Sequence, residues 1–373
     1  MKAHRERKFV GLFLVALVAL PVAQWCADLA AGVPLTGAAA VRRAPTVASL
    51  RAADAEFAAA LARNPYARLL AGWPGLSWLR GHESPVLAGR VVADEPWLFY
   101  RPDVRLISQR RPPGVADRAG PAVLDWHRQL ADRGIRLVVV VAPLKPALLP
   151  DRVARRFTVG GEPWRAPETA AALARWRAAG VEVVDLPAVF AALPPPGPAE
   201  EAWYEPADTH WSQRGLHVAA DAIIDAIGWE RVPGVYQVRE EMMRRPADLG
   251  RSRPPTSADD GREKEAGLVV ADAQGRAPAA SPGAAAVLLL GDSFCRIFEE
   301  GEVAGAGLRS QLAWRLGRPV GLIRQDGGGA TLVRQELARR PEWLRGVKVV
   351  VWEFAERDLL SAETEWAKVA LPR

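Results

Sequence analysis

The sequence predicts an α/β protein: a three-layer αβα domain with a largely parallel sheet, preceded by an N-terminal membrane-anchor helix. Two observations predict the domain, because apolar runs of strand length recur along the chain and segments of helical period separate them. A third observation, an apolar segment close to the N-terminus, predicts the anchor. In such a domain the ligand crevice lies at the carboxyl ends of the strands.

The first 28 residues carry the signals of an export segment. Basic residues come first, and residues 9–26 then form an apolar run that only Gln24 interrupts. This run nearly reaches the ~20 residues that a helix needs to cross a bilayer. The basic residues before it orient the N-terminus toward the cytoplasm. We expect residues 1–28 to be a signal anchor, with a cleaved signal peptide as the alternative.

Residues 29–84 are expected to form a stalk with an amphipathic helix, because apolar side chains recur at roughly helical spacing between positions 46 and 70. The predicted domain then spans residues 85–373. A dense aromatic run at 96–100 opens it. Two interpretations of this run stay open, the core of a first strand and the wall of a ligand site.

The next elements follow from changes of hydrophobic period. Residues 137–142 form a continuous apolar run, which is typical of a parallel strand covered on both faces. The segment 167–179 starts with a proline and is followed by Gly180, so a helix is predicted there. Residues 181–185 are predicted as a second strand, and residues 212–227 as a helix after a polar turn.

Residues 230–284 lose any period and collect Pro, Arg, Gly and acidic residues, so we expect an insertion of hairpins or loop there. The alternation of strands and helices then resumes. Strands are predicted at 286–290, 320–323 and 347–354, with helices at 308–316 and before Arg340.

Composition excludes several classes of protein. The formal net charge is only +6, and no basic run interleaved with aromatic residues occurs, so no nucleic-acid partner is expected. Cys26 lies in the apolar N-terminal run, which leaves Cys295 without a partner and disulfides without an architectural role. The five His show no paired-ligand spacing. We expect no metal and no cofactor.

Gly291-Asp292-Ser293 directly follows a predicted strand, at the edge where the crevice should lie. A serine there can act as a nucleophile if a base takes its proton and fixed N–H donors stabilise the oxyanion. Asp and Ser are also preferred helix caps, so a purely structural role is the alternative.

Asp208-Thr209-His210 favours the catalytic interpretation. Residues two apart in an extended segment point to the same side, so Asp208 can accept the Nδ1 proton of His210 while Nε2 faces outward. A helix cap before a surface histidine is the alternative. Because both motifs fall at turns of one predicted sheet, we expect Ser293, His210 and Asp208 to be nucleophile, base and orienting acid.

Further residues are candidates for the rest of the site. A tri-glycine turn follows the strand after Ser293, where bare backbone N–H groups can complete an oxyanion hole or admit a substrate closely. A merely flexible turn, or packing at the rim, is the alternative for these positions. The oxyanion and substrate-binding candidates are Gly327, Gly328, Gly329, Trp211, Trp352, Glu353 and Arg357.

Together these motifs resemble the alginate O-acetyltransferase family of the AlgJ and AlgX type, whose catalytic domain is SGNH-hydrolase-like. The resemblance covers roughly residues 85–360. Its motifs are Trp97–Tyr100, Val138–Pro143 with Lys145, Asp208–Trp211, Gly291–Phe294 and Trp352–Phe354. In ordinary SGNH hydrolases the serine comes first, whereas here, as in this family, Asp-x-His precedes it in a circularly permuted order.

The resemblance implies an O-acetyltransferase in which Ser293 forms an acetyl-serine, His210 is the general acid/base and Asp208 orients it. The acetyl group would pass to a hydroxyl of an exported polysaccharide, alginate or a similar exopolysaccharide. The resemblance also implies a periplasmic domain anchored to the inner membrane and a membrane-bound O-acyltransferase as acetyl source. Two alternatives stay open, a carbohydrate acetylesterase with the same triad and a non-catalytic scaffold of an export or modification complex.

Overall fold

A computed structural model describes residues 85–92, 95–108, 114–154, 164, 166–194, 202–250 and 262–372. All of them fall in the unit that begins at Pro85. The predicted anchor at 1–28 and the predicted stalk at 29–84 lie outside the described residues. In the part of the chain that is described, no helix combines the length and the apolar character that a bilayer crossing requires.

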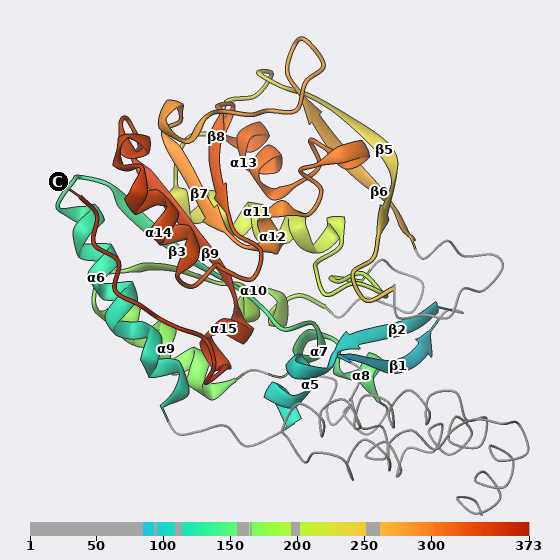
Figure 1. Cartoon of the computed structure of the whole chain (residues 1–373). Helices are drawn as coiled ribbons and strands as arrows, with labels where there is room; N and C mark the ends of the chain where they lie inside the picture. The colour runs from blue at the N-terminus through green and yellow to red at the C-terminus, as the bar shows by residue number, and fades with distance from the viewer. Residues whose placement is uncertain are drawn as a thin grey trace, which may run out of the picture. The chain divides into compact units, whose positions relative to one another are not determined.

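A five-stranded sheet lies at the centre, with strand order β4-β3-β9-β7-β8 (Figure 1). Every neighbouring pair in it is parallel. The middle strands β3, β9 and β7 are buried almost throughout, which explains why the sequence shows them as unbroken apolar runs. The strands are β3 (Arg136–Ala142), β4 (Glu182–Asp185), β7 (Val287–Gly291), β8 (Val320–Arg324) and β9 (Val349–Ala355).

Helices cover both faces of the sheet and complete the predicted three layers. Alternate residues of one strand enter different cores, as Val138 and Val139 of β3 do. One core contains side chains of α10 (Leu186–Ala191), α11 (Gln213–Ile227) and α13 (Leu308–Leu316). The other core contains side chains of α6 (Gly120–Ala131), α9 (Pro167–Ala178) and α14 (Leu332–Arg339).

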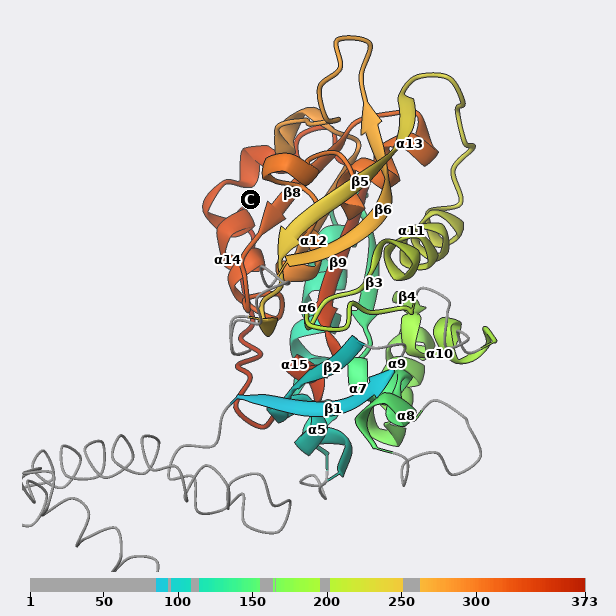
Figure 2. The ribbon, with the colours of Figure 1, turned by 90° about the vertical axis from the view of Figure 1, so that its right-hand side faces the viewer.

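Two antiparallel hairpins stand apart from the central sheet. The predicted opening strand is β2 (Glu95–Tyr100), which pairs with β1 (Val86–Val92) and does not join the parallel sheet. The expected insertion contains β5 (Gln237–Pro246) and β6 (Arg262–Ala271). Figure 2 shows β5 and β6 beside α11 and α13, with β1 and β2 below them.

Short helices follow the strands at their carboxyl ends and bring the predicted motifs to one edge of the sheet. They are α5 (Arg101–Ser108) after β2, α7 (Lys145–Leu148) and α8 (Pro150–Val153) after β3, α12 (Ser293–Arg296) after β7, and α15 (Glu356–Leu360) after β9. Parallel strands all end on the same side, so the turns that carry Ser293, the glycines and Arg357 share that side.

Candidate active site

Ser293 is the first residue of α12, at the sharp turn that ends β7. The cap of this helix is Asp292, whose carboxylate accepts a hydrogen bond from the backbone N–H of Phe294 at 2.8 Å. Ser293 is therefore not the cap, and its half-buried side chain is free for another role. Of the two residues considered as helix caps, Asp292 is the cap and Ser293 is not.

A buried acid supports this turn from below. Glu353 of β9 accepts hydrogen bonds from the backbone N–H of Asp292 at 3.1 Å and from the thiol of Cys295 at 3.3 Å. A Cβ atom on Gly291 would lie 2.7 Å from the Glu353 carboxylate, so only glycine permits this approach. Burial, followed by the nearby Asp292 carboxylate, raises the pKa of Glu353 well above its usual range.

Asp208 and His210 form the predicted pair. One carboxylate oxygen of Asp208 accepts hydrogen bonds from Nδ1 of His210 at 2.6 Å and from the backbone N–H of His210 at 3.0 Å. Both side chains are buried. The segment is a tight bend and not the extended chain that was expected. In this bend the Asp208 side chain bonds the backbone two residues ahead, as Asp often does in turns, and this brings it to Nδ1 of His210. The predicted pairing is present, but the turn and not an extended segment produces it.

Lys145 fixes the loop that carries this pair. Its buried Nζ donates to backbone carbonyls at 2.6–2.9 Å, those of Leu98, Glu205, Pro206 and Asp208. The ammonium also lies 4.9 Å from the ring centre of Phe99. A buried charge needs this many partners. Lys145 therefore joins the loop to β2. Trp97 and Phe99 of this strand are buried in the core, as the first of the two interpretations of the aromatic run has it.

The second oxygen of Asp208 is held by the hairpin. It accepts hydrogen bonds from the guanidinium of Arg245 at 2.7 Å and from the backbone N–H of Asp248 at 2.9 Å. Burial alone would raise the pKa of Asp208, but the charges of Arg245 and His210 and their hydrogen bonds hold it well below its usual range. Asp208 is therefore ionised and can orient an imidazole.

Arg245 and Asp248 were not predicted, since they lie in the aperiodic segment 230–284. Asp248 accepts a hydrogen bond from the backbone N–H of Thr209 at 2.9 Å, and its carboxylate lies 3.7 Å from Nδ1 of His210. Burial, followed by the charge of Asp208, raises the pKa of Asp248. No sequence motif marks either residue, because only the folded hairpin brings them to the pair.

Asp208, His210 and Asp248 place possible metal-binding atoms within 4.8 Å of one another. Both oxygens of Asp208 already accept hydrogen bonds from the protein, and Arg245 brings a positive charge to one of them. A metal ion would have to displace these donors. The arrangement favours proton transfer over metal binding.

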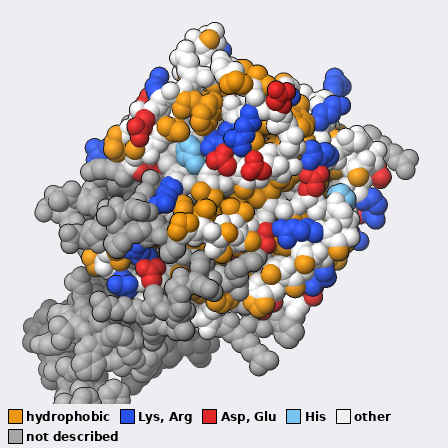
Figure 3. All heavy atoms as spheres, turned by 180° about the vertical axis from the view of Figure 1, so that it is seen from behind, with side chains coloured by type: hydrophobic (Ala, Val, Ile, Leu, Met, Phe, Trp, Pro, Cys, Tyr) orange, Lys and Arg blue, Asp and Glu red, His pale blue; other side chains and the backbone are white. Residues whose placement is uncertain are grey.

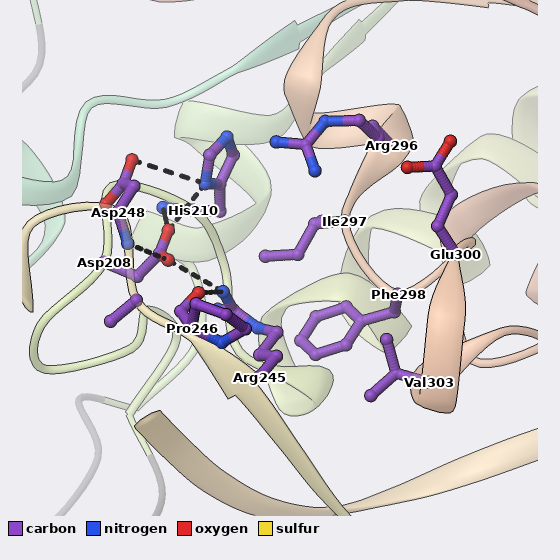
Figure 4. A pocket seen from close by; sticks show the side chains of 11 residues that line it. Asp208, His210, Arg245, Pro246, Asp248, Arg296, Ile297, Phe298, Glu300 and Val303 are labelled. Carbon is purple, nitrogen blue, oxygen red and sulfur yellow. Dashed lines mark hydrogen bonds and ion pairs between the residues drawn. The ribbon is translucent and has the colours of Figure 1, made fainter. Parts of the chain in front are cut away.

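A cavity of about 420 Å³ opens beside the pair. Figure 4 shows the guanidinium of Arg296 directed across this cavity toward His210, with Ile297 and Phe298 on its floor. Arg296 also pairs with Asp326 at 2.8 Å, next to the tri-glycine turn. On the face shown in Figure 3, basic and acidic side chains are interspersed and form no continuous basic stripe.

The tri-glycine turn reaches the nucleophile turn. A Cβ atom on Gly329 would lie 3.3 Å from Cβ of Asp292, and Gly327 adopts a positive φ of 66° that favours glycine. Within the described ranges, the backbone N–H groups of Ser293 and Gly329 donate no hydrogen bond. Both are available to an oxyanion, as an acyl-transfer site requires.

Several predicted substrate contacts prove to be interior side chains. Trp211 and Trp352 are fully buried, so their ring faces are closed to a sugar. Trp211 packs on Phe294 at 4.8 Å between ring centres, and Trp352 donates to the carbonyl of Gly329 at 2.7 Å. Glu353 is equally buried. These predictions as substrate contacts are wrong, because aromatic and acidic residues beside a site motif can support it from within.

Arg357 and Gly328 take intermediate positions. The Arg357 guanidinium donates to Asp103 at 3.0 Å and lies over the ring of Tyr100, with 27% of its side chain exposed. Gly328 is buried against Leu332. Arg357 therefore lies at the rim, whereas Gly328 shapes the turn.

The nucleophile and the base lie on neighbouring segments. The ring of Phe294, the residue after Ser293, packs edge-on against the imidazole of His210 at 4.9 Å between ring centres. Among the residues that the structure describes, no hydrogen bond joins the Ser293 hydroxyl to His210. Such bonds are often long before substrate binds. The orienting pair is thus assembled, and the complete triad stays a prediction.

Comparisons with known proteins give the same fold. Residues 91–356 match the family model described as an SGNH hydrolase-like domain, acetyltransferase AlgX. The O-acetyltransferase domain of Pseudomonas putida AlgJ superposes with a TM-score of 0.53 at 20% identity, over 73% of this chain and 92% of that domain. Pseudomonas aeruginosa AlgX gives 0.52 at 16% identity, over 72% of this chain and 61% of that protein. No curated protein sequence matches the chain.

Proposed function

Because the chain belongs to the family of SGNH hydrolase-like acetyltransferase domains of the AlgX type, we propose that it transfers acetyl groups to hydroxyls of an exported polysaccharide through an acetyl-serine. Family membership supports O-acetylation in general. The nucleophile, the intermediate and the acceptor belong to the proposal. The observation that carries it is the ionised Asp208 bound to His210 at the edge of the sheet where the Ser293 turn ends.

The reaction takes two balanced steps. The Ser293 hydroxyl attacks the acetyl carbon of the donor, His210 takes its proton, and the collapse of the intermediate expels the donor's leaving group with that proton. A sugar hydroxyl then attacks the acetyl-serine while His210 takes the new proton. His210 returns this proton to the Ser293 oxygen as the acetylated sugar leaves. Asp208 stabilises the imidazolium in both steps.

The N–H groups of Ser293 and Gly329, which donate no hydrogen bond among the described residues, would stabilise the oxyanion of each step. The acceptor would enter along the cavity beside Arg296. The two steps above use only protein side chains and backbone N–H groups.

The proposal includes a cellular setting. Residues 1–28 would anchor the domain to the inner membrane and place it in the periplasm. A membrane-bound O-acyltransferase would then supply acetyl groups, as the resemblance to the family implies. Alginate or a similar exopolysaccharide would be the acceptor.

An experiment with the full-length protein separates transfer from hydrolysis. The protein is incubated with an activated acetyl ester and a set of exopolysaccharide oligosaccharides, and the products are analysed by mass spectrometry. We expect acetylated oligosaccharide from the wild type and none from Ser293→Ala. The matched control is Ser281→Ala, an exposed serine outside the site. Free acetate without acetylated sugar would instead support the esterase.

The scaffold alternative is tested in cells. A scaffold would keep polymer acetylation when Ser293→Ala replaces the wild type, whereas an enzyme would lose it. Full acetylation in that strain, with normal protein levels, would contradict the proposal.

A further inference from the structure

Arg245 extends the catalytic pair by one residue. We propose that it is a positioning residue, which the β5–β6 hairpin delivers to Asp208 in order to keep that carboxylate charged and aimed at His210. The inference rests on the proposed function, because it assigns Arg245 a part in the same proton transfer. It also gives the hairpin, the segment without a recognisable motif, a role in catalysis.

The contacts of Arg245 are specific. One guanidinium nitrogen donates to Asp208 at 2.7 Å, and the other lies 3.3 Å from the carboxylate of Glu205. Only 11% of the Arg245 side chain is exposed. A guanidinium this buried is stabilised only where a negative charge accompanies it.

Asp208 is the acid that supplies this charge. The contact of Arg245 with Asp208 is the shorter of the two, at 2.7 Å against 3.3 Å for Glu205. Burial, followed by the neighbouring Glu265 carboxylate, raises the pKa of Glu205 well above its usual range, whereas the pKa of Asp208 is held well below its own. Asp248 bonds to Thr209 and not to Arg245, and the carboxylate of Glu265 also stabilises the charge of Arg245. Arg245 and Asp208 therefore form the charged pair, and His210 is its neighbour on the far side.

The backbone beneath Arg245 provides an independent observation. Phe298 adopts a φ of 65°, and among the described residues no other residue except glycine has a positive φ. This conformation is disfavoured for a bulky side chain and persists where the surroundings enforce it, often at functional sites. It places the Phe298 ring 4.9 Å from the guanidinium carbon of Arg245. The guanidinium of Arg245 therefore packs over the Phe298 ring in a cation–π contact.

The electrostatic effect follows from the order of charges. When His210 takes the serine proton, the ionised Asp208 stabilises the imidazolium. Arg245 opposes protonation of Asp208 and occupies its second oxygen, which leaves the first oxygen for Nδ1. Without the guanidinium, the Asp208–His210 pair would take up a proton more readily and the carboxylate could rotate.

The test uses the full-length protein with Arg245→Gln, Arg245→Lys and the matched control Arg239→Gln, which removes an exposed arginine from the same strand. Hydrolysis of an aryl acetate is followed across pH. We expect Arg245→Gln to lower kcat/KM by roughly 100-fold, as a misplaced catalytic group does. Its acid limb should move to higher pH. Arg245→Lys should recover part of the rate, and Arg239→Gln should match the wild type.

A second readout does not depend on turnover. With histidines labelled, the Nδ1–H resonance of His210, assigned by its loss in His210→Gln, should shift in Arg245→Gln and stay in place in Arg239→Gln. If the wild type is no faster than Ser293→Ala, the proposed function fails, and this resonance alone decides the inference. If Ser293 is required but Arg245→Gln keeps the wild-type rate, pH profile and resonance, the inference is overturned. Equal losses of rate and thermal stability in Arg245→Gln and Arg245→Lys, with an unchanged pH profile, would also overturn it.

Discussion

At the residue scale, burial in the protein interior changes the pKa of Asp358. Burial, followed by the carboxylate of Asp292, raises the pKa of Asp358 to about 7, although Arg357 acts in the opposite direction. The folded protein thus binds this proton more tightly than the unfolded chain, whose Asp has a pKa of about 3.9. The stability that Asp358 contributes is complete below about pH 4 and is lost as the pH rises to about 7.

Asp358→Asn should remove this pH dependence. Each pKa unit corresponds to ~1.4 kcal/mol, so the wild type should lose up to ~4 kcal/mol from this group over that range. The unfolding free energy of Asp358→Asn relative to the wild type should therefore rise between about pH 4 and pH 7 and stay level above that, measured by denaturant titration. Asp225→Asn, at a side chain that is 75% exposed, is the matched control for the change of charge. Parallel curves for Asp358→Asn and the wild type would contradict the assignment.

At the element scale, the start of α11 fixes the loop that carries His210. Ser212 caps this helix by accepting a hydrogen bond from the N–H of Gly215 at 3.2 Å. A Cβ atom on Gly215 would lie only 2.1 Å from the carbonyl oxygen of Trp203 and 3.1 Å from Cβ of Trp211. Because Trp211 follows His210 directly, a shift there moves the base.

Gly215→Ala should therefore lower both the melting temperature and the acyl-transfer rate. This is the opposite of the usual effect, because alanine in a helix is normally ~1 kcal/mol more stable than glycine. Gly120→Ala is the matched control in α6, since its Cβ would meet only Trp176 at an ordinary 3.7 Å. That variant should be as stable as the wild type or more so. Melting curves and rates of the two variants check the prediction. Equal behaviour of both would refute the proposed packing at Gly215.

The strands and helices could be predicted where their burial produces a regular pattern of apolar residues in the sequence. The strands β3, β7 and β9 are apolar along their length because helices cover both faces, and the sequence predicts each of them within two residues. Helix α6 was missed, although Pro121 in its first turn and its buried Trp126 and Leu130 are ordinary helix signals.

At the scale of the whole molecule, local and distant parts of the site differ in how far the sequence predicts them. Asp208 and His210 are two residues apart, so their pairing follows from a short turn. Arg245 lies 37 residues from Asp208 and reaches it only through the β5–β6 hairpin, which no periodicity announces. The buried tryptophans were misassigned for a related reason, because sequence alone does not distinguish a wall of the site from the core behind it.

The order of the motifs along the chain is compatible with the sheet. Asp208 and His210 follow β4 at one edge of the sheet, while Ser293 follows β7 on the other side of the central β9. Lys145, which follows the middle strand β3, donates to the carbonyl of Asp208 and so holds the intervening loop at the end of that strand. Segments that are distant in the sequence, after β4 and after β7, therefore reach the same carboxyl edge of the sheet.

Trapping of the acyl-enzyme tests most directly whether Ser293 is the nucleophile that His210 and Asp208 activate. The full-length protein is mixed briefly with 4-nitrophenyl acetate, quenched in acid and analysed by intact mass and peptide mapping. We predict one acetyl group on Ser293 in the wild type, none at that peptide in Ser293→Ala, and much slower labelling of Ser293 in His210→Ala. Stoichiometric labelling of another residue, or labelling of Ser293 at the same rate without His210, would contradict the account.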